Sequence, residues 1–253
     1  MNGHFVTDRG QIRTLNEDAG GIFYNLANQL LAIVADGMGG HQAGEVASQL
    51  AVSYMEEKWT SSEEIKTPLE AEEWLNRTLI EMNKAIYERS LENEAYEGMG
   101  TTVVLSICTD EFVTIAHIGD SRCYMVDDEK IELLTSDHSL VNELIRTGQI
   151  SEVDAEQHPR KNVLLRALGT EEKVVPDIKS INWDEKNFLI LCSDGLTNKI
   201  TESEIENFVR TYDDLELLCQ TFIDEANERG GEDNITVAVI HHDGSQKEGE
   251  SSC

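Results

Sequence analysis

Acidic residues follow several apolar, strand-like runs of the sequence. Three of these runs lead directly into an aspartate, at Asp36, Asp120 and Asp194, and two further acids, Asp18 and Asp233, flank such runs. A single Asp-Gly or Gly-Asp step is ordinary turn chemistry. Five acids at strand ends predict a carboxylate cluster wherever sheets gather those ends at one edge. Such a cluster is stable only with cations between its members.

The residue types also indicate which cation. Carboxylate, carbonyl and water oxygens suit Mg²⁺ and Mn²⁺. The seven histidines and five cysteines show neither H-E-x-x-H nor C-x-x-C spacing, which argues against zinc. The sequence leaves the choice between Mn²⁺ and Mg²⁺ open, because both ions take the same oxygen ligands.

A basic residue lies close to one of these acids. Arg13 precedes Asn16-Glu17-Asp18 by three residues. A guanidinium forms bidentate hydrogen bonds with phosphoryl oxygens, and two metal ions can hold the remaining oxygens and activate a water. The cluster and Arg13 together favour hydrolysis of phosphate esters, although an exposed loop residue is an equally good interpretation of Arg13 by itself.

The elements that must position these residues do not alternate as βαβα. Strand character occurs at Leu30–Ala35, Val103–Cys108, Val113–Ile118, Phe188–Cys192 and Ile235–Ile240. Long helices are expected at about 42–58 and 68–95, and Thr201 with Glu204 predicts a capping box on a later helix. Consecutive strands from about 101 to 134 predict antiparallel hairpins. We expect an α+β fold, a four-layer α-β-β-α sandwich with two packed, mainly antiparallel sheets and the metal site at the sheet edge.

Composition bounds the class of protein. The 253 residues carry a net charge of -29, which disfavours nucleic acid and anionic lipid as partners. The longest aliphatic run is far shorter than the roughly 20 residues of a membrane span, so we expect a cytoplasmic protein without membrane insertion. We also expect a monomer. Five cysteines without close pairs predict reduced, mostly buried thiols. One catalytic domain is expected over residues 1–243, followed by a disordered tail at 244–253.

Six motifs follow one another along the chain. They are Thr7-Asp8-Arg9-Gly10-Gln11-Ile12-Arg13-Thr14-Leu15-Asn16-Glu17-Asp18, Ala35-Asp36-Gly37-Met38-Gly39-Gly40-His41, Gly100-Thr101-Thr102, Ile118-Gly119-Asp120-Ser121-Arg122, Ser193-Asp194-Gly195-Leu196 and Glu232-Asp233-Asn234-Ile235-Thr236. Together they resemble the motifs of the metal-dependent type 2C Ser/Thr protein phosphatases (PPM family), in particular the bacterial branch, over about residues 3–241. The resemblance implies hydrolysis of phosphoserine and phosphothreonine esters by attack of a metal-bridging hydroxide, without a covalent enzyme intermediate.

Residue by residue, the resemblance implies a centre with two Mn²⁺ or Mg²⁺ ions. Asp36 would bridge the two ions, and the Gly37 carbonyl would bind one of them. Asp194 and Asp233 would bind the other ion. Arg13 would hold the substrate phosphate and stabilise the charge of the transferring phosphoryl group.

The remaining motif residues are implied to act around this centre. Glu17 and Asp18 would act through metal-bound waters, and Asn234 would support the phosphate pocket. Asp120, together with Asp194, matches the place where bacterial members can hold a third metal.

The general acid is the point at which the sequence departs from eukaryotic members. Met38 stands where those members usually carry a histidine proposed for this role. His41 lies three residues further on, but we expect it to open the following helix and not to donate the proton. A metal-bound water is the better candidate for the donor.

The segment Asp137–Gly169 resembles the flap that the family carries beside its active site. Its basic residues are Arg146, Arg160, Lys161 and Arg166. They would steer phosphoproteins toward the site, although a solvated loop explains them equally well. The resemblance implies phosphorylated proteins as substrates and a Ser/Thr kinase of the bacterial membrane type as a partner.

Other enzyme classes lack their motifs in this sequence. No cysteine is followed six residues later by an arginine, as a cysteine-dependent phosphatase requires, and the Gly-Lys pair of a P-loop and the G-x-S-x-G of a serine hydrolase are absent. A catalytically silent phosphoprotein-binding module on the same fold is the alternative from another class; such a module usually loses metal acids. A nearer alternative, the branch that dephosphorylates antagonists of anti-sigma factors, is expected to lack the Arg13 motif and to carry sensor domains.

Overall fold

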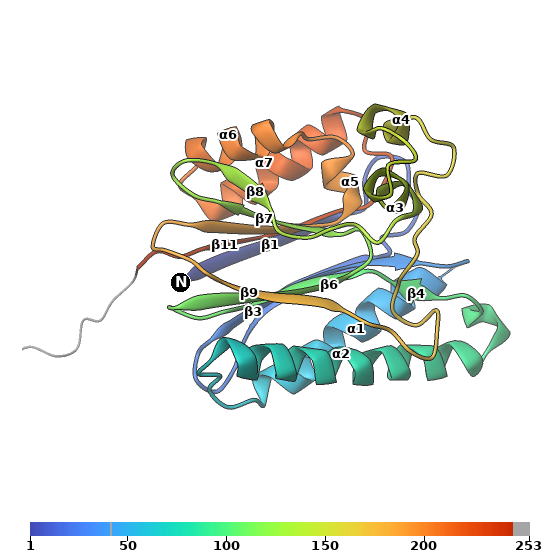
Figure 1. Ribbon diagram of the computed structural model, residues 1–253, viewed down its shortest axis with the longest axis horizontal. Helices are drawn as coiled ribbons and strands as arrows, with labels where there is room; N and C mark the ends of the chain where they lie inside the picture. Colours follow the sequence, from blue (N-terminus) through green and yellow to red (C-terminus); the bar gives the residue numbers. More distant parts are fainter. Residues whose placement is uncertain (41, 245–253) are drawn as a thin grey trace, which may run out of the picture.

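Two antiparallel β-sheets lie face to face in the computed structural model, which describes residues 1–40 and 42–244 (Figure 1). The first sheet has the strand order β1 (Asn2–Asp8), β11 (Ile235–His241), β10 (Phe188–Cys192), β7 (Arg122–Val126), β8 (Ile131–Leu133). The second sheet has the order β2 (Asp18–Tyr24), β3 (Leu30–Met38), β5 (Val103–Cys108), β6 (Phe112–Ile118), β9 (Asp177–Asn182), and β4 (Gly100–Thr101) pairs beside β3. The strand pairs of the described residues are all antiparallel.

Helices cover the outer face of each sheet, which confirms the predicted four-layer sandwich (Figure 1). α1 (Ala43–Thr60) and α2 (Pro68–Leu91) lie on the second sheet, and a 3-10 turn (Glu94–Tyr96) follows α2. α6 (Glu202–Thr211) and α7 (Leu215–Glu228) lie on the first sheet, and α6 begins with the predicted capping box of Thr201 and Glu204.

Three buried apolar layers separate the four structural layers. The layer between α1, α2 and the second sheet includes Leu75 and Met82, and the layer between α7 and the first sheet includes Phe222. The middle layer joins the two sheets through residues such as Val34 and Leu191. Burial on both faces explains why the central strands β3, β5 and β10 are continuous apolar runs and do not alternate with polar residues.

The strands between residues 101 and 134 form the expected hairpins, but they divide between the two sheets. β5 pairs with β6 in the second sheet, whereas β7 pairs with β8 in the first. The chain crosses from one sheet to the other through the short link 119–121, in which Gly119 has a positive φ of 110°. Asp120 therefore lies at the point where the chain passes between the sheets.

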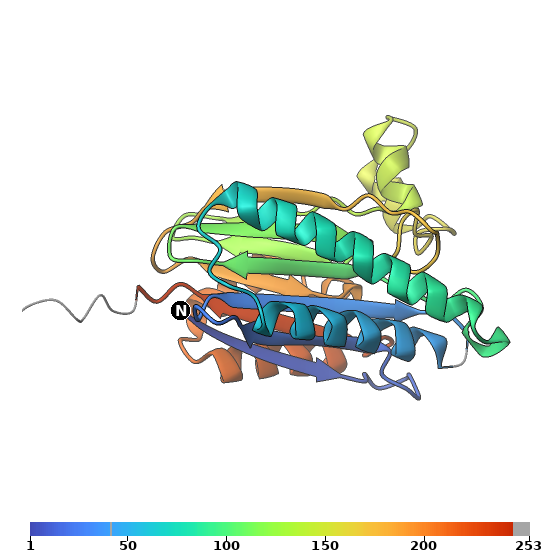
Figure 2. The same ribbon diagram turned by 90° about the horizontal axis from the view of Figure 1, so that it is seen from below.

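The predicted flap projects from one end of the sandwich (Figure 2). It carries two short helices, α3 (Leu140–Arg146) and α4 (Glu152–Glu156), and α3 has no buried residue. The remaining helix, α5 (Asp194–Thr197), is a single turn that follows β10.

Some sequence predictions concern residues that the structure does not describe, and others can be compared with it directly. The predictions for His41 and for residues 245–253 of the tail lie outside them. The described cysteines, Cys108, Cys123, Cys192 and Cys219, are free and buried, as predicted. Among the described residues, no helix combines the length and the apolarity that crossing a membrane requires.

Candidate metal centre

Asp18 and Asp36 face one another on neighbouring strands. β2 pairs with β3 in a register that sets Asp18 opposite Asp36. Asp18 is only 6% exposed, and this burial, together with the charges of Asp194 and Asp233, raises its pKa. Burial and the charges of Asp18 and Asp194 likewise raise the pKa of Asp36 well above its usual value. The two carboxylates thus lie in a site that disfavours uncompensated negative charge.

Three more acids reach the same edge from other elements. Asp194 follows β10, Asp233 precedes the neighbouring strand β11, and Asp120 lies in the link between the sheets. Burial and the charge of Asp233 raise the pKa of Asp194. Burial and the charge of Asp194 raise the pKa of Asp120 to about 7. The structure therefore brings the five predicted aspartates together, with contributions from both sheets.

These residues fit a divalent cation. Atom Oε1 of Glu17 is buried and has no hydrogen-bond partner among the described residues. Burial raises the pKa of this carboxyl, and the charge of Asp233 acts in the same direction. A cation, or water bound to it, would satisfy the unpaired oxygen and relieve the repulsion among the carboxylates. The individual ligand roles of Asp36, Gly37, Asp194 and Asp233 stay predictions.

Close backbone packing explains the glycine that follows two of the aspartates. A side chain on Gly37 would collide with the carbonyl oxygens of Gly44, at the start of α1, and of Glu17. A side chain on Gly195 would collide with the carbonyl oxygen of Asn234. Each Asp-Gly step is therefore a place where two backbone segments meet beside the cluster, and not only a turn.

The Gly-Thr-Thr motif holds the main chain of Asp36. The Thr102 N–H and the Thr101 hydroxyl both donate to the Asp36 carbonyl, at 2.8 and 2.9 Å, and the Asp36 N–H donates to Thr102 Oγ1 at 3.1 Å. Thr102 Oγ1 also lies 2.7 Å from the Ser121 hydroxyl. The motif thereby connects Asp36 to the link that carries Asp120, a role that the sequence alone did not indicate.

Arg13 lies at the edge of the cluster. Its Nη2 is 2.9 Å from Oδ2 of Asp233, and its Nε donates to the Glu232 carbonyl at 3.3 Å. The Arg13 side chain is 46% exposed, so the remaining donors of its guanidinium are accessible from solvent. The acids and the partly exposed guanidinium of Arg13 therefore form a site open to an anionic substrate.

Asn234 holds the loop on which Arg13 lies. Its Oδ1 accepts from the Glu17 N–H at 2.7 Å, and its Nδ2 donates to the carbonyls of Arg9 and Leu15 at 2.8 and 2.9 Å. Asn234 is 4% exposed. The structure gives Asn234 a contact that positions the loop, and its predicted support of the phosphate pocket stays a prediction.

A cavity of about 440 Å³ adjoins the cluster on the flap side. Asp120 and Asp194 line it from the sandwich, and Asn142 and Lys161 line it from the flap. Of the basic residues of the described flap, Lys161 is the one that lines this cavity, and Arg146 pairs with Glu143 within α3. Lys161 is thus the flap cation that the structure places beside the acids.

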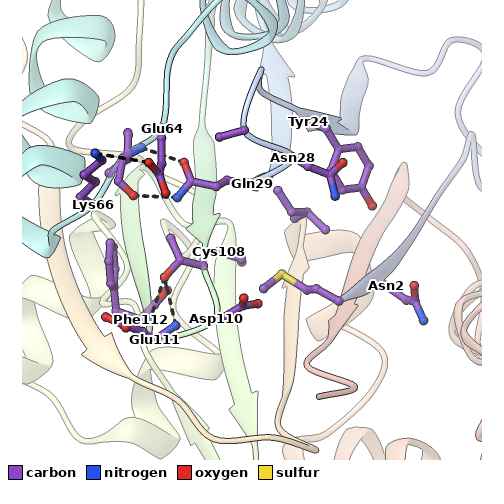
Figure 3. A pocket seen from close by; sticks show the side chains of 15 residues that line it. Asn2, Tyr24, Asn28, Gln29, Glu64, Lys66, Cys108, Asp110, Glu111 and Phe112 are labelled. Carbon is purple, nitrogen blue, oxygen red and sulfur yellow. Dashed lines mark hydrogen bonds and ion pairs between the residues drawn. The ribbon is translucent and has the colours of Figure 1, made fainter. Parts of the chain in front are cut away.

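A second cavity, of about 570 Å³, lies at the opposite end of β3 and is separate from this centre (Figure 3). Its lining includes Gln29, Glu64 and Lys66. Gln29 donates to the Ile65 carbonyl at 2.6 Å, and Lys66 pairs with Glu64 at 3.5 Å. Gln29, Glu64 and Lys66 are therefore engaged with other residues of the lining, and the lining includes none of the predicted site residues.

Comparison with known proteins agrees with this geometry. The model of the family described as protein phosphatase 2C matches residues 9–229. The chain is 48% identical to the serine/threonine phosphatase stp of Listeria monocytogenes serotype 4b, over 98% of each chain. It superposes on the crystal structure of the serine/threonine phosphatase Stp1 from Staphylococcus aureus with a TM-score of 0.89 and 39% identity, covering 94% of this chain and 93% of that one.

A further solved structure bears on the metals. The catalytic domain of the serine threonine protein phosphatase PstP, crystallised in complex with two manganese ions, has a TM-score of 0.81 and 29% identity, covering 94% of this chain and 96% of that one. The match of the family model, the identity to curated relatives over nearly the whole chain and the four-layer fold agree. The chain therefore belongs to the protein phosphatase 2C family.

Proposed function

We propose that this chain hydrolyses phosphoserine and phosphothreonine in phosphoproteins and that it depends on Mn²⁺ or Mg²⁺ for this reaction. The observation that carries the proposal is the convergence of five aspartates from both sheets on one edge, with Arg13 beside Asp233. Two divalent ions held there would supply the positive charge and the activated water that phosphate ester hydrolysis requires.

The side chains divide the remaining tasks. Asp36, Asp194 and Asp233 would hold the ions, with the carbonyl of Gly37 as a further ligand. The guanidinium of Arg13 would bind the phosphoryl oxygens and orient the ester for attack. Because Arg13 keeps its charge throughout, it also stabilises the negative charge that develops in the transition state.

Further parts of the proposal concern the surroundings of the site. Glu17 and Asp18 would act through water, and Asp120 with Asp194 would hold a third ion at the cavity that both residues line. Residues 1–243 would act as one catalytic domain, because the three apolar layers join all of its helical and strand layers. We also propose that the chain is a cytoplasmic monomer that opposes a Ser/Thr kinase.

The test is hydrolysis of a phosphothreonine peptide by the purified protein. Phosphate release is measured with Mn²⁺, with excess chelator, and with Asp36→Asn in parallel. We expect turnover that needs the metal and is lost in the variant. A folded protein that binds Mn²⁺ but releases no phosphate would contradict the proposal and would favour the silent phosphoprotein-binding module.

A further inference from the structure

The flap is fastened to the sandwich through two chain segments, residues 136–139 and 163–168, here called the flap stem. The two segments pair with each other: the Leu165 N–H donates to the His138 carbonyl at 2.7 Å, and Ser139 forms a β-bridge with Leu164. The Leu140 N–H, at the start of α3, extends this pairing by donating to the Val163 carbonyl at 2.8 Å. Because α3 contributes no buried residue, the flap stem fixes the position of that part of the flap.

His138 connects the flap stem to the link that carries Asp120. Its backbone N–H donates to the Gly119 carbonyl at 2.9 Å, and its ring Nδ1 accepts from the Gly119 N–H at 3.1 Å. His138 is 8% exposed, so water competes little for these bonds. Two hydrogen bonds therefore hold the residue that immediately precedes Asp120.

The other ring nitrogen of His138 faces an ion pair. Nε2 lies 3.4 Å from Oδ2 of Asp177, and Arg166, in the second segment of the flap stem, donates to Oδ1 of Asp177 at 3.0 Å. Since Nδ1 accepts from the Gly119 N–H, a neutral ring carries its proton on Nε2. Of the two neighbours of Nε2, Asp177 can accept this proton, whereas Arg166 Nη1, 3.3 Å away, can only donate and directs its hydrogen bond to Asp177. Burial and the neighbouring His117 lower the pKa of His138, which agrees with a neutral ring.

A metal site is the other interpretation of this cluster. One ligand atom each from His117, His138 and Asp177 lies within 4.8 Å of the others. Coordination through His138 Nε2 would leave both ring nitrogens without a proton, because Nδ1 already accepts from Gly119. The Arg166 guanidinium, 3.3 Å from Nε2, would also repel a cation. The geometry therefore favours a hydrogen-bonded connection over a metal site.

We propose that His138 is a positioning residue that uses its two ring nitrogens for two different tasks. Nδ1 orients the link that carries Asp120, and Nε2 fastens the flap stem to Asp177 on β9. The cavity between the flap and the metal centre is then set from both sides by one side chain. This inference rests on the proposed function, because Asp120 matters to turnover only if the acids hold metal.

Two replacements separate the tasks of the ring. In His138→Asn, the amide oxygen lies near the place of Nδ1 and can still accept from Gly119, but the contact with Asp177 is lost. In His138→Gln, the amide nitrogen reaches toward Asp177, but the acceptor for the Gly119 N–H is lost. Asp177→Asn removes the charge that pairs with Arg166 and weakens the acceptor of the Nε2 proton, without touching the buried ring.

Each variant is examined by three measurements. Hydrogen exchange reports on the Gly119 amide, the rate of trypsin cleavage after Arg160 and Lys161 reports on the flap, and calorimetry with Mn²⁺ reports on metal binding. In His138→Gln we expect the amide hydrogen of Gly119 to exchange faster. We also expect the Mn²⁺ affinity and kcat of this variant to fall about 10- to 100-fold, as for other groups that orient metal ligands. We expect His138→Asn and Asp177→Asn to be cleaved faster in the flap and to raise KM for a phosphopeptide while keeping kcat.

The matched control is His4→Gln, on the remote strand β1, which should match the parent in all three measurements. Equal effects of His138→Asn and His138→Gln, or unchanged Gly119 exchange in a folded His138→Gln, would overturn the inference. If His138→Gln does not fold, unchanged flap cleavage in Asp177→Asn overturns it. Failure of the proposed function is distinguishable, because the parent would then release no phosphate while the exchange and cleavage measurements remain readable.

Discussion

At the scale of single residues, the aspartates of the cluster are buried or half-buried, whereas Arg13 is exposed at its edge, so changes at the two should affect the stability of the fold differently. The buried aspartates have raised pKa values because burial and their neighbours disfavour charge. Arg13 is instead half-exposed, and it pairs with Asp233 at the rim. A change at Arg13 should therefore alter substrate binding with little effect on folding.

This separation gives the first prediction. We expect Arg13→Ala to lower kcat/KM for a phosphothreonine peptide about 10- to 100-fold, because a hydrogen bond to a charged group contributes about 1.5–3 kcal/mol. Arg13→Lys should recover part of the loss, since it keeps the charge without the bidentate geometry. Steady-state kinetics measure both effects, and the free energy of unfolding in urea should change by less than about 0.5 kcal/mol.

Arg77→Ala, an exposed residue on α2, is the control for removal of a positive charge from so acidic a chain. If it lowers kcat/KM as much as Arg13→Ala does, the effect belongs to long-range attraction of the anionic substrate. The prediction that Arg13 contacts the substrate phosphate directly would then be wrong.

At the scale of elements, the capping box of α6 also ties this helix to α7. The Glu204 carboxylate accepts from the Thr201 N–H at 2.9 Å, and Arg229, just after α7, lies 2.9 Å from it. These contacts lower the pKa of Glu204 to about 2, from an ordinary value of 4.5, with Arg229 as the largest cause. One side chain thus joins the start of one helix to the end of the next.

The second prediction concerns the pH dependence of this contact. Because the folded-state pKa is lowered, the stabilisation by Glu204 is present above about pH 4.5 and is lost as the pH falls toward 2. Glu204→Gln should therefore be less stable than the parent at pH 7, and the two should converge in acid. Thr201→Ala should cost about 1 kcal/mol through the lost cap.

Urea unfolding between pH 3 and 7 measures the difference. Glu202→Gln, an exposed neighbour in the first turn of α6, is the control. If the difference in free energy of unfolding between the parent and Glu204→Gln stays constant over this pH range, the charge of Glu204 is not the cause of the difference.

The same scale shows which elements the sequence could predict. β3, β5 and β10 were predictable because strands buried on both faces are continuous apolar runs, and Asp36 and Asp194 follow directly from where these runs end. β1 and β9 were not named as strands, because their side chains are mostly half-buried or exposed and their apolar signal is weak.

The contacts between distant elements could not be read from the sequence. His138 and Asp177 are 39 residues apart and belong to no motif that pairs them. They meet because β9 joins the edge of the second sheet while the flap stem crosses its end. Arg166 was predicted either to steer substrates or to be solvated. The structure leaves it exposed and adds an ion pair with Asp177 that the sequence did not indicate.

At the scale of the whole molecule, the metal centre lies where the two sheets meet. The Ser193 hydroxyl, at the end of β10 in the first sheet, donates to Oδ2 of Asp18 in the second sheet at 2.7 Å. Asp36 comes from the second sheet, and Asp194 and Asp233 flank strands of the first. A metal held by these residues would connect both sheets, so its binding energy would contribute to the stability of the whole sandwich.

The third prediction follows from this connection. Mn²⁺ at about 100 times its dissociation constant should add about 2.7 kcal/mol to the free energy of unfolding, which corresponds to a rise in melting temperature of about 5 to 10 °C for a chain of this size. Thermal unfolding monitored by circular dichroism, with Mn²⁺ or with chelator, measures the shift. Asp36→Asn should abolish most of it, whereas Asp110→Asn, beside the remote cavity, should leave it unchanged. A rise that is equally large in Asp36→Asn would mean that the ion acts on the acidic surface at large, because the net charge of -29 attracts cations without any specific site.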